Sequence, residues 1–324
     1  MSRATAHLLA LQEECGGTLP FERYMREGLY HPEFGYYTAR IRDVGARGDF
    51  STFATLGRAL AEFLARWIIE NKARDVIEVG PGNGQLAAQI LGELGWWSRH
   101  SIRYHLVDVD GPLRDAQEKR LRGFRVQRHA DLQTALRAAG GRACIFSNEL
   151  PDAFPCRVFE LTAEGWMELH LRLAGDGIHE ILHPADLPES TAFAGDFRPG
   201  QRLEIHESYR EWLRIWASEW TSGSMLTIDY GDTLPSLYRR RTSGTLRGYA
   251  HHQRLTGLEI YQAPGRLDLT ADVNFSDLQK WGEDLGWRTT RQATLGEFLD
   301  QQTPRQFLDA AKAFRVLEQT NSPH

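Results

Sequence analysis

The feature that most constrains the fold is a glycine turn between two apolar segments, VIEVGPGNGQLAAQIL at residues 76–91. A β-branched apolar run precedes the turn and a helical pattern follows it, which predicts a strand, a tight turn and a helix. A dinucleotide site needs G-x-G-x-x-G, and a phosphate loop needs a lysine followed by Ser or Thr. Here Gly84 completes G-x-G-x-G, Gln85 occupies the place of the third dinucleotide glycine, and that lysine is missing. The turn therefore favours another cofactor, with a nucleotide site or a purely structural turn as the alternatives.

Strand and helix patterns alternate around and after this turn. Apolar strand patterns, of which the third is the weakest, recur at 75–80, 103–110, 124–128 and 143–148. Helical patterns separate them, and another helical pattern at 56–73 precedes the first strand. Such alternation predicts an α/β fold with a parallel, doubly wound sheet.

The pattern changes after Pro155. Residues 156–173 predict two antiparallel strands joined at Glu164–Gly165. We further expect a helix at 202–220, a buried strand at 224–231 that returns to the sheet, a loop-rich stretch at 244–275 and a last strand at 314–319. An α+β insertion thus interrupts the doubly wound core.

The length of 324 residues, with 41% hydrophobic and 25% charged residues, is typical of a globular protein with a sizeable core. The pattern divides the chain into four regions. These are an amino-terminal helical cap and lid, a cofactor-binding half of the core, an inserted hairpin and helix, and the rest of the core with substrate-site loops, at 1–73, 74–155, 156–223 and 224–324.

Charge and cysteine content argue against several kinds of partner. The net charge of −5 gives no general attraction to nucleic acid or to anionic membranes. No run approaches the ~20 apolar residues of a membrane-spanning helix. Three scattered cysteines, Cys15, Cys144 and Cys156, predict neither a disulfide framework nor a metal site and fit a reducing compartment. We therefore expect a cytoplasmic protein without a bound metal.

Acidic residues stand at the ends of the strands beside the glycine turn. Together with the turn they resemble motif I of class I methyltransferases that use S-adenosylmethionine (SAM). Glycines let the backbone approach a ligand. In this interpretation Glu78 meets the ammonium group of SAM or orders water beside it, and Asp108 accepts both ribose hydroxyls. Asp131, after the weak strand, is a candidate for the adenine amino group or simply an exposed loop acid.

The strand pattern at 143–148 ends in SNELPDAFP, at the sheet edge where open α/β sheets bind ligands. This turn carries Asn148, Glu149 and Asp152, with a simple capped turn as the alternative interpretation. Asp229, in IDYGD, ends a strand that we expect beside the Asn148 strand. These polar side chains are therefore predicted to face one cleft.

These motifs resemble the MidA family of SAM-dependent methyltransferases over nearly the whole chain. The segments that carry the resemblance are FERYMREGLYHPEFGYYTA, GARGDFSTF, IEVGPGNGQL, YHLVDVDGPLRDAQEKRL, SNELPDAFP, EGWMELHL, LTIDYGD, GTLRGYAHH and PGRLDLTADVNFSDL. The resemblance implies a seven-stranded Rossmann-like sheet, mostly parallel, with a helical cap, an inserted substrate region and SAM as methyl donor. Because the mitochondrial family member methylates an arginine of a complex I subunit, it also implies a protein arginine as methyl acceptor.

The resemblance assigns roles to individual positions. The SAM loop becomes Gly80, Gly82 and Gly84, and the ribose acid becomes Asp108. The family's Asn-Glu-x-x-Asp turn, which lies beside the methyl group, becomes Asn148, Glu149 and Asp152. Asp49 and Thr52 are expected, from the resemblance alone, to close over SAM from the amino-terminal cap.

An arginine acceptor requires carboxylates, because a guanidinium is protonated at neutral pH and is a poor nucleophile. Carboxylates must hold it, polarise one nitrogen and receive a proton. We therefore predict Glu149 and Asp152 as the catalytic residues, followed by Asp229. The substrate site is predicted to be lined by Arg247, Tyr249 and His251.

The sequence thus predicts a SAM-dependent methyltransferase that methylates a protein arginine by in-line transfer, in a chain that is a monomer or a homodimer. Two alternatives remain open. One is a small-molecule O- or N-methyltransferase, in which the insertion encloses the acceptor. The other is a SAM-binding assembly factor that acts by binding a partner protein.

Overall fold

The computed structural model describes residues 2–41, 58–109, 111–175, 177–250, 253–299 and 308–322. The chain forms two compact units, each made of three separate stretches. The hairpin unit comprises Met1–Ile41, Pro151–Arg210 and Asp232–Asp277, and the sheet unit comprises Arg42–Leu150, Glu211–Gly231 and Leu278–His324. Among the described residues, no helix combines the length and the apolar character needed to span a membrane. The division into four regions stays a prediction.

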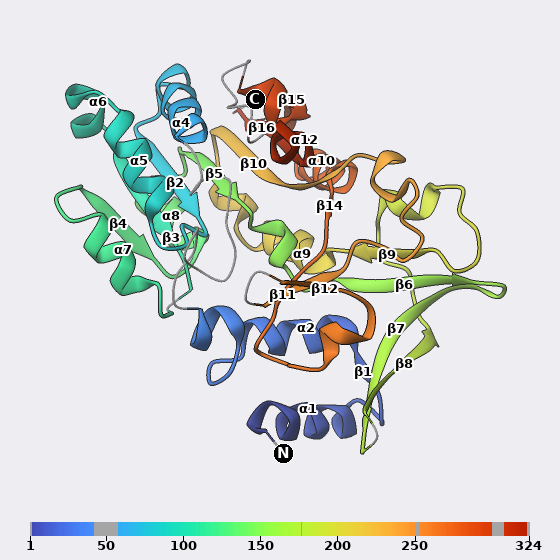
Figure 1. Cartoon of the computed structure of the whole chain (residues 1–324). Coiled ribbons are helices and arrows are strands. Elements are labelled where there is room, and N and C mark those ends of the chain that lie inside the picture. Colours follow the sequence, from blue (N-terminus) through green and yellow to red (C-terminus); the bar gives the residue numbers. More distant parts are fainter. Residues whose placement is uncertain are drawn as a thin grey trace. The chain divides into compact units, whose positions relative to one another are not determined.

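The sheet unit is built on an eight-stranded mixed sheet (Figure 1). Seven strands follow the order β15-β16-β10-β5-β2-β3-β4, and the two-residue strand β14 (Val273–Asn274) is added off this path. Their bounds are β2 (Asp75–Val79), β3 (Arg103–Val107), β4 (Val126–His129), β5 (Cys144–Asn148), β10 (Gly223–Asp232), β15 (Arg288–Thr294) and β16 (Phe314–Asn321). The predicted α/β class is confirmed, with one strand more than the predicted seven.

The middle of this sheet is parallel. β2 pairs in parallel with β3 and β5, β3 with β4, and β5 with β10. At the other edge, β16 runs antiparallel to both β10 and β15. β2 is buried along its whole length, as expected for a central parallel strand covered on both faces. The carboxyl ends of β2, β3 and β5 therefore meet at one edge of the sheet.

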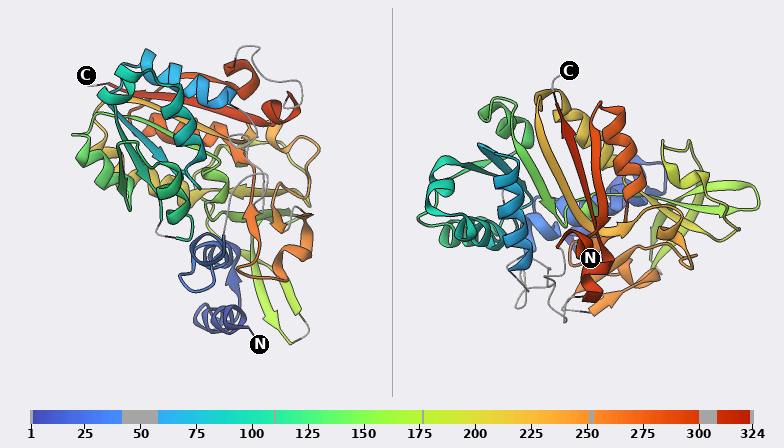
Figure 2. Two further views of the ribbon diagram at one scale, coloured as in Figure 1. Left: turned by 60° about the vertical axis from the view of Figure 1, so that its left-hand side comes forward. Right: turned by 90° about the horizontal axis from the view of Figure 1, so that it is seen from above.

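Helices lie on both faces of the sheet (Figure 2). The helices within or entering this unit are α4 (Ala59–Glu70), α5 (Gln85–Glu93), α6 (Trp96–Ser101), α7 (Arg114–Arg120), α8 (Leu132–Ala138), α9 (Glu207–Trp216), α10 (Phe275–Asp284), α11 (Leu295–Phe298) and α12 (Leu308–Ala313). Apolar side chains of α4 and α5 pack with those of β2, β3, β5, β10 and β16 in one hydrophobic core. This core holds the glycine turn on a rigid support.

The hairpin unit contains a second, five-stranded sheet. It consists of β1 (Leu19–Pro20), β6 (Arg157–Thr162), β7 (Gly165–Ala174), β8 (Gly177–Pro184) and β9 (Arg202–Ile205). β6 and β7 are antiparallel and turn at Ala163–Glu164, one residue earlier than predicted, and Gly165, the first residue of β7, has a φ of +119° that favours glycine. The predicted hairpin is confirmed. The predicted helix at 202–220 is wrong at its start, because Arg202–Ile205 pair with β6 and the helix begins only at Glu207.

Amino-terminal helices and a small sheet also belong to the hairpin unit. The helices are α1 (Arg3–Glu14), α2 (Phe21–Tyr30) and the π-helix η1 (Tyr36–Arg40). The small sheet has the order β12-β11-β13, with bounds β11 (Arg247–Ala250), β12 (Gln253–Leu255) and β13 (Asp268–Thr270). The stretch at 244–275, predicted as loop-rich, therefore contains short strands that hold Arg247 opposite Thr270.

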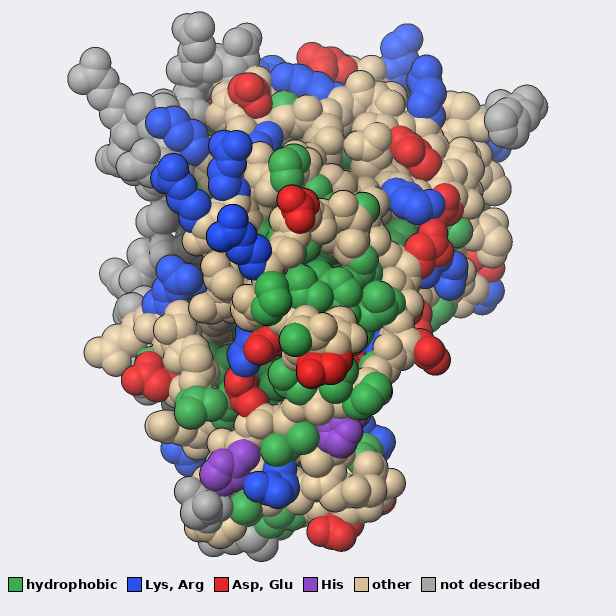
Figure 3. Space-filling model, turned by 90° about the vertical axis from the view of Figure 1, so that its right-hand side faces the viewer, with side chains coloured by type: hydrophobic (Ala, Val, Ile, Leu, Met, Phe, Trp, Pro, Cys, Tyr) green, Lys and Arg blue, Asp and Glu red, His purple; other side chains and the backbone are tan. Residues whose placement is uncertain are grey.

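The apolar core of the hairpin unit reaches its surface. Phe159, Leu203 and Ile205 are fully buried, and larger side chains pack around them while remaining partly exposed, among them Trp166, Phe193 and Phe197. Figure 3 shows hydrophobic side chains gathered on the side that carries β6–β8 in Figure 1, bordered by acidic side chains. Monomeric proteins also expose patches of this kind, so the patch does not by itself indicate a partner.

Candidate active site

The glycine turn has a backbone that only glycine adopts readily. Gly80, Gly82 and Gly84 have φ values of +71°, +53° and +78°. A Cβ on Gly80 would lie 3.1 Å from Leu150 Cδ1, and one on Gly84 would lie 3.3 Å from the Cα of a neighbouring helix residue. Side chains at these positions would add both strain and crowding. The residues predicted as the SAM loop therefore form a turn that needs glycine for its backbone conformation and, at Gly80 and Gly84, for close packing against Leu150 and α7.

Hydrogen bonds hold the turn against β3 and α7. The Gly80 amide donates to Val107 O at 2.9 Å. Gln117 Nε2 donates to both Gly82 O, at 2.7 Å, and Asp108 Oδ2, at 2.6 Å. Gln117 thus links the turn to the predicted ribose acid. The sequence analysis missed Gln117. The only feature that could have indicated its role is that a polar residue occupies the one buried position of α7.

Glu78 is a buried acid near the carboxyl end of β2. Its side chain is 2% exposed, and Tyr104 donates a hydrogen bond to Oε2 at 2.7 Å. Burial, helped by the negative charge of Asp108, raises the pKa of Glu78 to about 7 against the lowering effect of the Tyr104 hydrogen bond. A buried carboxyl group of this kind is stabilised in its charged form when a cation binds beside it. Glu78 therefore fits the predicted role toward an ammonium group.

The replacement Glu78→Gln is expected to separate stability from binding. The pKa of Glu78, about 7, lies above its ordinary value of 4.5. Above pH 7 the buried charge therefore lowers the free energy of unfolding, and this effect disappears as the pH falls and Glu78 takes up a proton. Glutamine removes the charge and still accepts from Tyr104. We expect the free energy of unfolding of the cofactor-free chain to rise at pH 8 by up to about 3 kcal/mol, and little at pH 5. Urea unfolding at both pH values measures this, and a less stable variant at pH 8 would contradict it.

At the end of β5, the structure brings Asn148 and Glu149 together. Asn148 Nδ2 donates to Glu149 Oε1 at 3.2 Å, and Glu149 has a φ of +53°, which is uncommon for a non-glycine residue. Asn148 Oδ1 and Ser147 Oγ are buried, and neither has a hydrogen-bond partner among the described residues. Buried polar atoms are normally paired. Strain and unpaired oxygens at one strand end are features expected of a site that awaits a ligand.

Asp229 lies on the neighbouring strand. β10 pairs in parallel with β5, Ile228 is opposite Asn148, and the Glu149 amide donates to Ile228 O at 2.9 Å. The predicted neighbourhood of the two strands is confirmed. Asp229 is fully buried, and its Oδ1 accepts from the Tyr230 amide at 2.7 Å. β10 continues to Asp232, so the prediction that Asp229 ends its strand is wrong, and Asp229 lies within the strand.

Asp152 belongs to the hairpin unit, in the short 3-10 helix η2 (Pro151–Ala153). Its side chain is buried, and Oδ2 accepts from Thr270 Oγ1 at 2.6 Å. Burial raises the pKa of Asp152. Three peptide units join Glu149 to Asp152, so their Cα atoms are at most about 11 Å apart. The chain itself therefore keeps these two predicted catalytic residues near each other.

Arg247 and Tyr249 meet in the small sheet of the hairpin unit. Arg247 Nε donates to Tyr249 Oη at 3.0 Å, and its guanidinium forms an ion pair with Asp272. Burial alone would lower the pKa of Arg247, but the Asp272 carboxylate raises it above its ordinary value. Arg247 is thus paired inside the unit. Its predicted contact with substrate stays a prediction.

Replacing Arg247 by methionine is expected to destabilise the hairpin unit. The change leaves Asp272 buried with Arg241, whose side chain is about half exposed, as its one remaining ion-pair partner among the described residues. Removing one partner of a buried pair costs about 3 kcal/mol or more. Urea unfolding should show this loss, and the double variant Arg247→Met, Asp272→Asn should recover part of it. If the single variant is as stable as the parent, the ion pair contributes nothing to stability.

Glu204 supports the same loop and was missed by the sequence analysis. Its carboxylate accepts from Thr245 N at 2.9 Å, Thr245 Oγ1 at 2.9 Å and Leu246 N at 3.3 Å. It is almost completely buried, and burial raises its pKa. A Cβ on Gly244 would overlap the Glu204 side chain. Glu204 therefore fixes the backbone just before Arg247.

The remaining predicted residues have other positions. Asp131 is exposed at the amino end of α8, where Oδ1 accepts from Thr134 N at 2.7 Å and Oδ2 accepts from Thr134 Oγ1 at 3.1 Å. These hydrogen bonds lower the pKa of Asp131. Asp131 thus caps a helix, and its contact with adenine stays a prediction. Asp49, Thr52 and His251 lie outside the described residues.

A doubly wound sheet with a glycine turn after β2 and acids after β3 and β5 defines a Rossmann-like methyltransferase of class I. The chain belongs to the S-adenosyl-L-methionine-dependent methyltransferase family Methyltransf_28, whose model matches residues 55–293. The predicted MidA-like family is thereby confirmed, and SAM is the methyl donor.

Similar proteins cover most of the chain. The mitochondrial protein arginine methyltransferase NDUFAF7 of Danio rerio is 28% identical over 306 residues, which are 83% of this chain and 69% of that protein. The Homo sapiens protein of the same name is 26% identical over 307 residues, 82% of this chain and 66% of that protein. A COG1565 superfamily structure from Burkholderia thailandensis, bound to S-adenosyl-homocysteine, has a TM-score of 0.85 at 27% identity and covers 98% of this chain and 91% of that one.

Proposed function

We propose that this methyltransferase transfers the methyl group of SAM to an arginine guanidinium of a protein substrate. The observation that carries the proposal is the similarity, over 82–83% of the chain, to proteins named protein arginine methyltransferases. Two carboxylates on neighbouring strands support it. Glu149 directly follows β5 and is partly buried, and Asp229 lies near the end of β10 and is fully buried. A guanidinium needs such acids as partners.

The cofactor is proposed to lie against the turn Gly80–Gly84. The turn is partly exposed at Gly80 and Gly82, and Gly84 precedes helix α5, whose positive end favours a carboxylate. Glu78 would meet the ammonium group and Asp108 the ribose hydroxyls, with Gln117 fixing the Asp108 carboxylate. When bound, SAM supplies an electrophilic methyl group. The unpaired Asn148 Oδ1 would find a donor at the same edge of the sheet.

The chain's own acids are proposed to prepare the acceptor. Glu149 would hold the guanidinium by charge-assisted hydrogen bonds, align one nitrogen for in-line attack and take up the proton that is lost. Asn148 Nδ2, 3.2 Å from Glu149 Oε1, keeps the carboxylate in place. Asp152 is tied to this position by the short chain segment between them, and Asp229 lies on the neighbouring strand.

Methyl transfer to protein extract tests the function. The full chain is incubated with SAM labelled in its methyl group and with extract separated into protein and low-mass fractions. We expect the label in protein, as methylarginine found by mass spectrometry after complete hydrolysis, and no label with the Gly80→Val variant. Label only in the low-mass fraction would replace the proposal with a small-molecule methyltransferase. SAM binding without any transfer would favour the assembly factor.

The cytoplasmic location and the homodimer remain predictions from the sequence. The named relatives are mitochondrial proteins, which makes location a separate question from activity. Sedimentation of the purified chain would measure the oligomeric state, and a fluorescent fusion in the source cell would show the location.

A further inference from the structure

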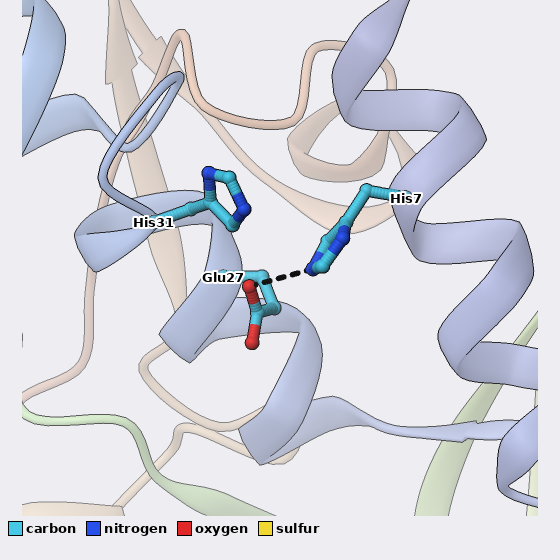
Figure 4. Close-up of side chains that lie close together, drawn as sticks. All are labelled: His7, Glu27 and His31. Carbon is cyan, nitrogen blue, oxygen red and sulfur yellow. Dashed lines mark hydrogen bonds and ion pairs between the residues drawn. The ribbon is translucent and has the colours of Figure 1, made fainter.

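Two histidines and a glutamate meet in the hairpin unit (Figure 4). His7 is on α1, Glu27 is in the last turn of α2, and His31 is the residue at which α2 ends. One ligand atom from each side chain lies within 4.8 Å of the others. His7 Nε2 and Glu27 Oε2 are 2.9 Å apart. The three donors thus come from two helices that are separate in the sequence.

We propose that His7, Glu27 and His31 form a binding site for one divalent cation of the zinc class. Two imidazoles and one carboxylate are a ligand set that zinc uses in proteins, with a water molecule in the fourth position. Glu27 and His31 are four residues apart, the spacing that puts two side chains on one face of a helix. Each contributes one atom, and His7 closes the set from the opposite helix.

The distances are close to those of a formed site. Bonds of about 2.1 Å in a tetrahedral arrangement place ligand atoms about 3.4 Å apart. The His7–Glu27 pair, at 2.9 Å, would open slightly, and His31 would move inward from a separation of at most 4.8 Å. Side-chain rotations provide shifts of this size without a change of the backbone. The side chains of His7 and Glu27 are 35% and 19% exposed, so an ion has access from solvent.

The surrounding residues hold the histidine at the end of α2. The His31 ring stacks on the ring of Phe34, with centroids 3.8 Å apart. The backbone carbonyl of His31 accepts from Gly35 N at 2.7 Å and from Thr38 Oγ1 at 2.6 Å. Figure 4 shows one ring nitrogen directed toward the other two side chains. The other, Nδ1, accepts from Glu33 N at 3.2 Å. When the other ring nitrogen, Nε2, binds the metal, Nδ1 carries the proton and no longer accepts from Glu33 N. Glu33 is exposed, so its amide would donate to water instead.

An ordinary ion pair would involve only His7 and Glu27. Such a partly exposed ion pair contributes at most about 1 kcal/mol to the free energy of unfolding, and it does not involve His31. The metal site, in contrast, requires all three side chains. Dependence of metal binding on His31 therefore separates the two interpretations. The site consists of hairpin-unit residues only, whereas the glycine turn and its acids belong to the sheet unit, so the proposal is independent of the methyl acceptor.

Titration of the metal-free full chain with Zn²⁺, followed by calorimetry, tests the proposal. We expect one equivalent to bind, and His31→Gln or His7→Gln to weaken the affinity at least about 10-fold, because even groups behind a ligand contribute that much. Zn²⁺ should also raise the melting temperature of the parent but not of the variants. His100→Gln, at an exposed histidine of α6, is the matched control and should bind like the parent.

Two results would overturn the proposal. One is the absence of saturable binding by the parent chain. The other is an unchanged affinity in either His31→Gln or His7→Gln, with circular dichroism showing that the variant is folded. Co²⁺ provides a second measurement, because its visible absorption reports directly on the ligands. A Co²⁺ spectrum of the parent that is typical of free aqueous ion would also reject the site.

Discussion

Replacing Gly80 by valine is expected to abolish cofactor binding while leaving the fold intact. A β-branched residue at a φ of +71° is strained, and its Cβ would lie 3.1 Å from Leu150 Cδ1. The turn would have to move away from the position at which its backbone can meet SAM. A loss of about 3 kcal/mol in binding corresponds to a SAM affinity that is weaker by 100-fold or more. Calorimetric titration with SAM measures this.

Gly92→Ala is the matched control. Gly92 lies in α5, only eight residues after Gly84, and an added Cβ there would meet nothing within 4 Å. Alanine is a better helix former than glycine by up to about 1 kcal/mol, so this variant should be slightly more stable and should bind SAM normally. If Gly80→Val binds SAM as well as Gly92→Ala does, the glycine turn is not the cofactor site.

Replacing Glu149 by glutamine is expected to stop methyl transfer without preventing SAM binding. Glutamine has the same size, so it can keep the contact with Asn148, but it cannot carry a charge or accept the proton. Loss of a general base lowers kcat by about 10² to 10⁴. The affinity for SAM should change by less than about threefold, because the proposed cofactor contacts lie on the glycine turn and on Asp108. Single-turnover transfer and calorimetry separate the two effects.

The control for this variant is Glu118→Gln, which changes an exposed acid of α7. It should transfer methyl groups at the parent rate. A Glu149→Gln variant with full activity would remove Glu149 from the mechanism and direct attention to Asp152 and Asp229. A variant that loses SAM binding as well would show that Glu149 helps to form the cofactor site.

The central strands β2 and β5 were predictable because they are mostly apolar and are buried along almost their whole length. The patterns at 75–80 and 143–148 correspond to β2 and β5, and the glycine turn lies between β2 and α5 as expected. The pairing of the strand that carries Asp229 with the Asn148 strand also followed from the sequence, because a buried apolar strand after the insertion was expected to rejoin the sheet. Local patterns were sufficient where burial was continuous.

Other elements depend on contacts distant in sequence. Residues 202–205 continue a helical pattern, yet they form β9 because Leu203 pairs opposite Phe159. The strands β11 and β13 are only four and three residues long, too short for an alternating pattern. Their buried polar side chains bond to partners elsewhere in the chain: Arg247 to Asp272, Thr270 to Asp152 and Asp268 to Tyr37. Gln117 and Glu204 were missed for the same reason, because each has a partner more than 30 residues away, Gly82 for Gln117 and Thr245 for Glu204.

The interleaving of the two units has a consequence for the chain as it leaves the ribosome. β5 is complete at Asn148, but its partner β10 begins only at Gly223, 75 positions later. At about 5–20 residues per second, one edge of this apolar strand stays unpaired for roughly 4 to 15 s. Unpaired strand edges are sites of aggregation. We expect the nascent protein to depend on chaperones during this interval, although each finished unit is compact.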